Sequence, residues 1–108
     1  DYPDFAHRVA ESVARGEFDR GILICKSGIG MSIAANRTAG ARTALVYNHE
    51  AAALCRAHND ANILVLGSHF VSEEEARKIL ETFLLTSFEG GRHCRRVEKM
   101  ERKGEMES

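Results

Sequence analysis

The fold is decided by residues 22–36, which read ILICKSGIGMSIAAN. An apolar run ends at Cys25, a glycine-containing turn follows over residues 26–30, and a helix-compatible segment begins at Met31. A strand, a tight loop and a helix N-terminus in this order can hold an anion or an oxyanion on backbone N–H groups. The turn lacks the Gly-Lys-Ser/Thr of a Walker loop and the third glycine of a dinucleotide fingerprint. We therefore interpret the rest of the chain as the scaffold that holds this turn and as the source of further side chains placed around it.

The segments around this stretch alternate between helical and strand patterns. The spacing of apolar residues and the glycines predict helices over residues 3–15, 31–37 and 49–58 and a short helix from Arg92. A capping box formed by Ser72 and Glu75 predicts a further helix after Ser72. Continuous apolar runs predict strands over residues 21–25, 43–47 and 63–66. Such runs are typical of strands buried on both faces. The alternation predicts right-handed βαβ units and a parallel sheet, whose ligands lie beyond the carboxyl ends of the strands.

Composition limits the class of protein. With 108 residues the chain is expected to form one domain, residues 1–108, with a charged helix or tail over residues 95–108. A formal net charge of −1 argues against binding to nucleic acid or to an anionic membrane, and no apolar run reaches the length of a membrane span. Three cysteines without metal-ligand spacing indicate reduced thiols and a cytoplasmic protein. Three strands make a narrow sheet, so we expect a preceding βαβ portion or a partner chain.

A few side chains could carry chemistry. Cys25, between a strand end and a helix N-terminus, is either an activated thiolate or a small core residue. Ser27 either relays a proton or caps the helix, and His58 is either a general acid–base or a favourable charge at a helix end. Arg92 and Arg96 share a helix face and could grip a phosphate, although a solvated face is the simpler interpretation. The other histidines and cysteines are assigned no role: His7, His49, His93, Cys55 and Cys94.

Taken together, these pieces resemble the ribose-5-phosphate isomerase B family, which includes the galactose-6-phosphate isomerase subunits. The resemblance runs nearly end to end and in register. The matching segments are residues 1–3, 21–25 with 27–36, 58–60 with Asn62, 67–68, and 90–93 with 96–97. The resemblance implies a three-layer α/β/α sandwich of Rossmann type with a parallel sheet. It also implies a homodimer or tetramer with shared active sites, and no metal or organic cofactor.

The same resemblance implies that a phosphorylated sugar is isomerised between aldose and ketose, with ribose 5-phosphate and ribulose 5-phosphate as the expected pair. Cys25 would take the C2 proton to form an enediolate, Ser27 would shuttle the hydroxyl proton, and His58 would open the sugar ring. Arg92 and Arg96 would hold the phosphate. The remaining expected substrate contacts are Tyr2, Lys26, Gly28, Ile29, Gly30, Asn59 and His69.

The chain departs from the family pattern at three points. The N-terminal strand with its Gly-x-Asp-His-x-Gly loop is absent, Lys26 stands where glycine is common, and His69 replaces a frequent phosphate-binding arginine. Two alternative functions stay open on this account, a six-carbon sugar-phosphate isomerase acting on allose or galactose 6-phosphate, and a non-catalytic sugar-phosphate-binding module. A thiol redox role is more distant, because no second cysteine lies near Cys25 in the sequence.

Overall fold

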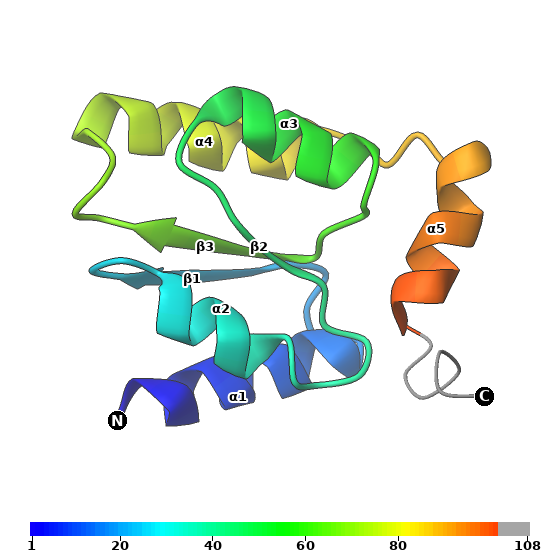
Figure 1. The fold of residues 1–108 in the computed structure, drawn as a ribbon, viewed down its shortest axis with the longest axis horizontal. Coiled ribbons are helices and arrows are strands. Elements are labelled where there is room, and N and C mark those ends of the chain that lie inside the picture. Colours follow the sequence, from blue (N-terminus) through cyan, green and yellow to red (C-terminus); the bar gives the residue numbers. More distant parts are fainter. Residues whose placement is uncertain (102–108) are drawn as a thin grey trace.

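A computed structural model of the chain describes residues 1–101 and contains three strands and five helices over that range (Figure 1). In chain order these are α1 (Tyr2–Ala14), β1 (Gly21–Cys25), α2 (Ile29–Ala35), β2 (Thr43–Leu45), α3 (His49–Ala57), β3 (Ile63–Gly67), α4 (Glu73–Leu85) and α5 (Arg92–Glu101). The predicted helices and strands are therefore present. The part of the predicted charged tail beyond residue 101 lies outside the described residues.

The three strands form one parallel sheet in the order β1-β3-β2. Gly21 pairs with Ile63 at one end of β1, and Cys25 pairs with Gly67 at the other. All five residues of the central strand β3 are buried, as its unbroken apolar sequence predicts. Cys25 and Gly67 consequently lie together at the carboxyl end of the sheet.

Helices cover the sheet on both faces (Figure 1). α1 and α2 pack on one face, where their alanines, Val13 and Met31 meet Leu23, Ile63 and Val65. α3 and α4 pack on the other face, where Ile79 and Phe83 meet Leu64 and Leu66. This confirms the predicted three-layer α/β/α arrangement, and it places α5 beyond the end of the sheet at which the strands begin.

The prediction that residues 21–25 are buried on both faces is wrong. Leu23 is buried, but Ile22 and Ile24 are 38% and 58% exposed. The cause is the position of β1 at the edge of the sheet. α1 and α2 cover one of its faces, whereas the core under α3 and α4 draws on β2 and β3 and includes no residue of β1.

The elements also differ from the predictions at their ends. α2 begins at Ile29 rather than at Met31, because Gly28 adopts a left-handed conformation and serves as its N-cap. β2 stops at Leu45 rather than at Tyr47, because the chain turns toward Asn48, whose side chain caps α3. Across the described range, no helix combines the length and apolar character that crossing a membrane requires.

The predicted capping box is present only in half. The Ser72 side chain accepts a hydrogen bond from the Glu75 N–H at 3.0 Å. The Glu75 carboxylate does not accept the reciprocal hydrogen bond from the Ser72 N–H. It accepts a hydrogen bond from the His49 N–H at 2.7 Å and lies 2.8 Å from the His49 ring nitrogen Nδ1. Glu75 therefore caps the N-terminus of α3 from the neighbouring helix α4, which joins the two helices on one face of the sheet.

Candidate functional site

Cys25 is held by the loop that follows it. Its Sγ accepts a hydrogen bond from the Gly28 N–H at 3.0 Å. Gly28 has φ +84°, and a Cβ at this position would lie 2.5 Å from Leu45 and 2.9 Å from Val65, so only glycine fits the turn. The turn that sequence analysis singled out therefore serves the cysteine directly.

The rest of the loop is braced by its own hydrogen bonds and by its neighbours. The Ser27 hydroxyl accepts the Ile29 N–H at 3.2 Å, and the Ser27 carbonyl accepts the Tyr47 hydroxyl at 3.1 Å. A Cβ on Gly67 would collide with that carbonyl, so the close approach of β3 to the loop depends on glycine there. In the resting loop, the Ser27 hydroxyl is thus occupied by the N–H of Ile29, the first residue of α2.

Lys26 and His69 are exposed and share a backbone contact, because the His69 N–H donates to the Lys26 carbonyl at 2.9 Å. Asp60 is the only non-glycine residue among residues 1–101 with positive φ. Lys26 therefore occupies its position without the strain that a left-handed turn would impose on a side chain. A lysine at this point adds a cation beside Cys25.

Tyr2 reaches the same loop from the first turn of α1. Its hydroxyl lies so close to Gly30 that a Cβ there would collide with it. Tyr2, Cys25, His69 and residues 26–30 thus come together at the carboxyl end of the sheet, and we call this group the cysteine edge. All of its members are predicted site residues, whereas Tyr47, which supports the loop from outside the group, was not predicted from the sequence.

The predicted site residues outside the cysteine edge are His58, Asn59, Arg92 and Arg96. His58 caps the end of α3 and precedes β3, which begins at Ile63 and runs toward the level of Cys25. Five residues of strand span roughly 13 Å. Within one chain, His58 and Cys25 therefore lie toward opposite ends of the sheet and are not brought together.

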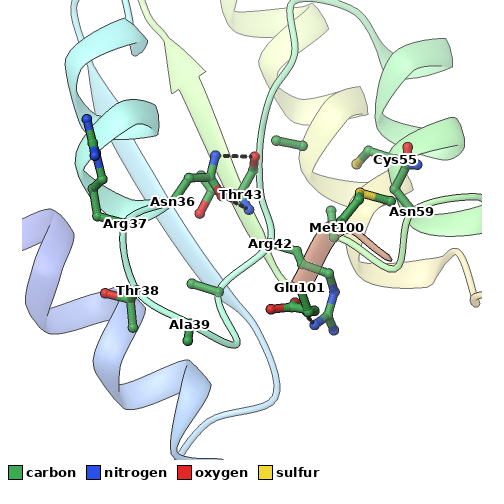
Figure 2. A pocket seen from close by; sticks show the side chains of 13 residues that line it. Asn36, Arg37, Thr38, Ala39, Arg42, Thr43, Cys55, Asn59, Met100 and Glu101 are labelled. Atoms are coloured by element: carbon green, nitrogen blue, oxygen red, sulfur yellow. Dashed lines mark hydrogen bonds and ion pairs between the residues drawn. The ribbon is translucent and has the colours of Figure 1, made fainter. Parts of the chain in front are cut away.

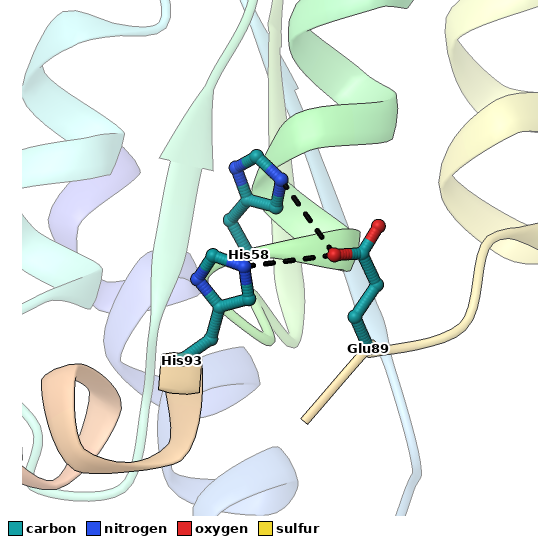
Figure 3. Close-up of side chains that lie close together, drawn as sticks. All are labelled: His58, Glu89 and His93. Carbon is teal, nitrogen blue, oxygen red and sulfur yellow. Dashed lines mark ion pairs between the residues drawn. The ribbon is translucent and has the colours of Figure 1, made fainter. Parts of the chain in front are cut away.

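His58 instead meets two residues that sequence analysis did not select, Glu89 and His93 (Figure 3). The rings of His58 and His93 are stacked, with centroids 4.3 Å apart. The Nε2 atoms of His58 and His93 lie 3.8 and 3.5 Å from Glu89 Oε1. Burial holds the pKa of His93 below its usual range, and the charges of His58 and Arg92 lower it further. We call His58, Glu89 and His93 the histidine cluster.

The position of His93 between Arg92 and Arg96 was the only sequence signal for this cluster. All three residues belong to α5, where Arg92 and Arg96 are exposed and one helical turn apart. His93 is only 5% exposed and turns inward to His58. The sequence around Glu89 does not indicate that it lies beside His58. Its place there depends on the hydrogen bond from the Glu89 N–H to the Ala57 carbonyl at 3.0 Å.

Asn59 faces a different space from its neighbour His58. It lines a cavity of about 560 Å³ beside β2, together with residues 36–39 and the last turn of α5 (Figure 2). One wall is fixed by the ion pair between Arg42 and Glu101 at 2.8 Å. The Thr43 hydroxyl oxygen is buried and has no hydrogen-bond partner among residues 1–101. The structure thus separates Asn59 from His58, although the two are adjacent in sequence.

The other two cysteines have different surroundings from Cys25. Cys55 is buried and its thiol donates to the Ala52 carbonyl at 3.1 Å. Burial raises the pKa of the Cys55 thiol to about 11. Cys94 is exposed on α5, and all three cysteines are free thiols. Cys55 is thus part of the core that α3 and α4 form on their face of the sheet.

The arrangement of the loop and sheet can be compared with known proteins. A family model described as Ribose/Galactose Isomerase matches residues 1–100. The chain belongs to the ribose/galactose isomerase family. Ribose-5-phosphate isomerase B of Escherichia coli is 50% identical over 98 residues, which are 91% of this chain and 66% of that protein.

Solved structures of the ribose/galactose isomerase family agree with the fold. Ribose-5-phosphate isomerase B of Clostridium thermocellum superposes with a TM-score of 0.94 at 49% identity, over 100% of this chain and 73% of that one. The enzyme of Mycoplasma genitalium with bound ribulose-5-phosphate gives 0.90 at 50% identity, over 94% and 68%. These matches confirm the resemblance and the Rossmann-type fold drawn from the sequence.

The chain spans about two thirds of the length of the curated relatives that it matches.

Proposed function

We propose that the whole protein interconverts ribose 5-phosphate and ribulose 5-phosphate through an enediolate, without a metal or organic cofactor. The observation that carries this proposal is the hydrogen bond from the Gly28 N–H to Cys25 Sγ at the carboxyl end of a parallel strand. A cysteine side chain held at this place in the loop is positioned to take a proton from a substrate carbon as a general base. The names of the relatives support the same reaction class.

In the proposed reaction, the Cys25 thiolate takes the proton from C2 of the open-chain aldose and leaves an enediolate. The same thiol then returns the proton to C1, while Ser27 moves the hydroxyl proton between the two oxygens. No electron leaves the substrate, so the step needs no oxidant or reductant. Residues of the cysteine edge therefore have to exchange only protons with the sugar.

The developing charge on the enediolate oxygen needs preorganised N–H donors. Two donors of the loop are already used in the resting protein, since Gly28 donates to Cys25 and Ile29 donates to Ser27. We expect the enediolate oxygen to be held by the remaining N–H groups of residues 26–30, with Tyr2, Lys26 and His69 around the sugar phosphate. Asn59 remains a proposed substrate contact.

The proposed active site requires a second copy of the chain. His58, Arg92 and Arg96 are the proposed ring-opening and phosphate-binding residues, and they lie at the far end of the sheet from Cys25. Two copies packed so that one chain's cysteine edge meets the other's histidine cluster would complete each site. Four apolar side chains on α1 and α2 are more than half exposed and suit burial against a second copy: Tyr2, Phe5, Ile29 and Ile33. We infer that the chain forms one isomerase domain of such a dimer or tetramer.

Replacing Cys25 tests this proposal. In the whole protein, we expect Cys25→Ala to abolish the conversion of ribose 5-phosphate, because no other group at the cysteine edge replaces the base. Binding of the sugar phosphate, measured by calorimetry, should largely survive. The matched control is Cys94→Ala, which removes an exposed thiol and should leave activity unchanged. Full activity in Cys25→Ala would contradict the assignment of Cys25 as the base.

The second candidate is an isomerase for a six-carbon sugar phosphate such as allose or galactose 6-phosphate. It stays open because His69 stands where a phosphate-binding arginine is frequent in the family that the sequence resembles, so one contact to the sugar phosphate is changed. Comparing kcat/KM for five- and six-carbon substrates separates the two enzymes. A non-catalytic binding module would bind these compounds without exchanging the C2 proton in heavy water.

A further inference from the structure

We propose that His58, Glu89 and His93 form a binding site for a divalent transition-metal ion such as Zn²⁺, and that the bound ion inhibits the enzyme. The inhibition rests on the proposed function, because it arises from the loss of His58 as the ring-opening acid–base. The metal site itself rests on the geometry of the histidine cluster.

The spacing of the three side chains suits one ion. Tetrahedral zinc with ligands at about 2.0–2.1 Å places neighbouring ligand atoms roughly 3.4 Å apart. In the histidine cluster, Glu89 Oε1 lies 3.8 Å from His58 Nε2 and 3.5 Å from His93 Nε2. One ligand atom from each residue lies within 4.8 Å of the others (Figure 3). Only the two stacked rings must open out, so that both Nε2 atoms face the ion.

The backbone around the three residues places them side by side. His58 caps α3, and the Glu89 N–H donates to the Ala57 carbonyl at 3.0 Å, which fixes Glu89 beside the same helix end. The His93 N–H donates to the Gly90 carbonyl at 3.1 Å and orients the first turn of α5. His93 is buried. Ordering the His93 ring for an ion therefore costs less than it would for a side chain on a free surface, whereas the His58 and Glu89 side chains, 40% and 60% exposed, become ordered when the ion binds.

The chemistry of the ligands selects the ion. Two imidazoles and one carboxylate form a common zinc set that leaves a fourth position for water. Imidazole suits Zn²⁺ and Cu²⁺, whereas Mg²⁺ and Ca²⁺ prefer oxygen ligands. Arg92 and Arg96 stand on the same helix as His93 and repel any cation, so weak electrostatic binding of Mg²⁺ is opposed as well. Binding must come from the nitrogen–metal bonds.

Calorimetric titration of the metal-free whole protein with Zn²⁺ tests the site. We expect one ion per chain, and affinity lower by about tenfold or more in Glu89→Gln, which keeps the size of the side chain and weakens one ligand. Glu98→Gln, an exposed change on α5, is the matched control and should bind as the wild type does. Mg²⁺ should give no binding.

Equal Zn²⁺ affinity in the wild type and Glu89→Gln would overturn the site, because the ion would then sit elsewhere. Activity gives a separate readout. Zn²⁺ should reduce isomerase activity, and adding a chelator should restore it. Glu89→Gln should need about tenfold more Zn²⁺ for the same loss of activity. Zn²⁺ binding without inhibition would overturn the inhibitory role alone. Absence of isomerase activity in the metal-free protein would count against the proposed function, while the titration would still decide the metal site.

Discussion

Gly28 meets two structural requirements, one of backbone conformation and one of packing. Its positive φ of +84° forms the turn after Cys25, and its missing side chain lets the loop approach Leu45 and Val65. The N–H that this turn presents donates to Cys25 Sγ. The conformation of one residue therefore links the packing of the sheet to the surroundings of the proposed base.

Gly28→Ala is expected to lower the free energy of unfolding by about 2–4 kcal/mol, because left-handed strain and overpacking of the core add together. Gly16→Ala is the matched control, since Gly16 has nearly the same φ of +81° but nothing within 4 Å of the place that a Cβ would take. It should cost only the strain, about 1–2 kcal/mol. Urea denaturation of both variants measures the difference, and equal losses would show that close packing around Gly28 contributes nothing.

At the scale of the elements, the ends of helices and the edges of the sheet account for the differences between prediction and structure. Ser72 and Glu75 have the spacing of a capping box, yet Glu75 caps α3. The apolar run of β1 has the composition of a buried strand, yet Ile22 and Ile24 are exposed at the edge of the sheet. Local pattern predicts that an element exists, whereas neighbours decide what its side chains contact.

Glu75→Gln is expected to lower the thermal midpoint of unfolding near neutral pH. The hydrogen bond from the His49 side chain, with that from its backbone N–H, holds the pKa of Glu75 below its ordinary value of 4.5. A depressed carboxyl pKa stabilises the fold above about pH 4.5 and loses this effect as the pH falls through the folded pKa. The difference between wild type and variant should therefore shrink in acid.

Glu74→Gln is the control for this change, because Glu74 is exposed in the same turn of α4 and pairs loosely with Lys78 at 3.9 Å. Thermal unfolding followed from neutral to acid pH should show a smaller effect of Glu74→Gln. The same pH dependence in both variants would contradict the cross-helix role of Glu75.

At the scale of the whole molecule, the proposed active site is divided between the two ends of the sheet. Cys25 lies at the carboxyl end, and His58 lies before the start of β3. A single copy therefore holds two separate halves. If two copies share their sites, each site takes Cys25 from one chain and His58 from the other.

This division predicts complementation between two inactive variants. Cys25→Ala and His58→Ala chains, co-refolded in equal amounts, should form mixed dimers with one intact site of two. With half of the dimers mixed, activity on the cyclic substrate should recover to about a quarter of the wild-type value. Each variant refolded alone is the control. Recovery no greater than the sum of the two controls would indicate that each site lies within one chain.

The sequence by itself determined the order of helices and strands, the parallel sheet and the loop at Cys25, because these follow from local apolar pattern and from glycines in a tight turn. It also carried the resemblance to the family that the comparisons confirm. These features depend on residues that are neighbours along the chain.

Which side chains meet across the chain depends on how the helices and strands pack in three dimensions. Glu89 and His93 join His58 because the segment after α4 is hydrogen-bonded to the end of α3, a contact between residues far apart in the sequence that leaves no local pattern. Likewise, the exposure of Ile24 follows from the position of β1 at the sheet edge. Contacts of this kind depend on how the elements pack, and packing brings together residues that no spacing in the sequence relates.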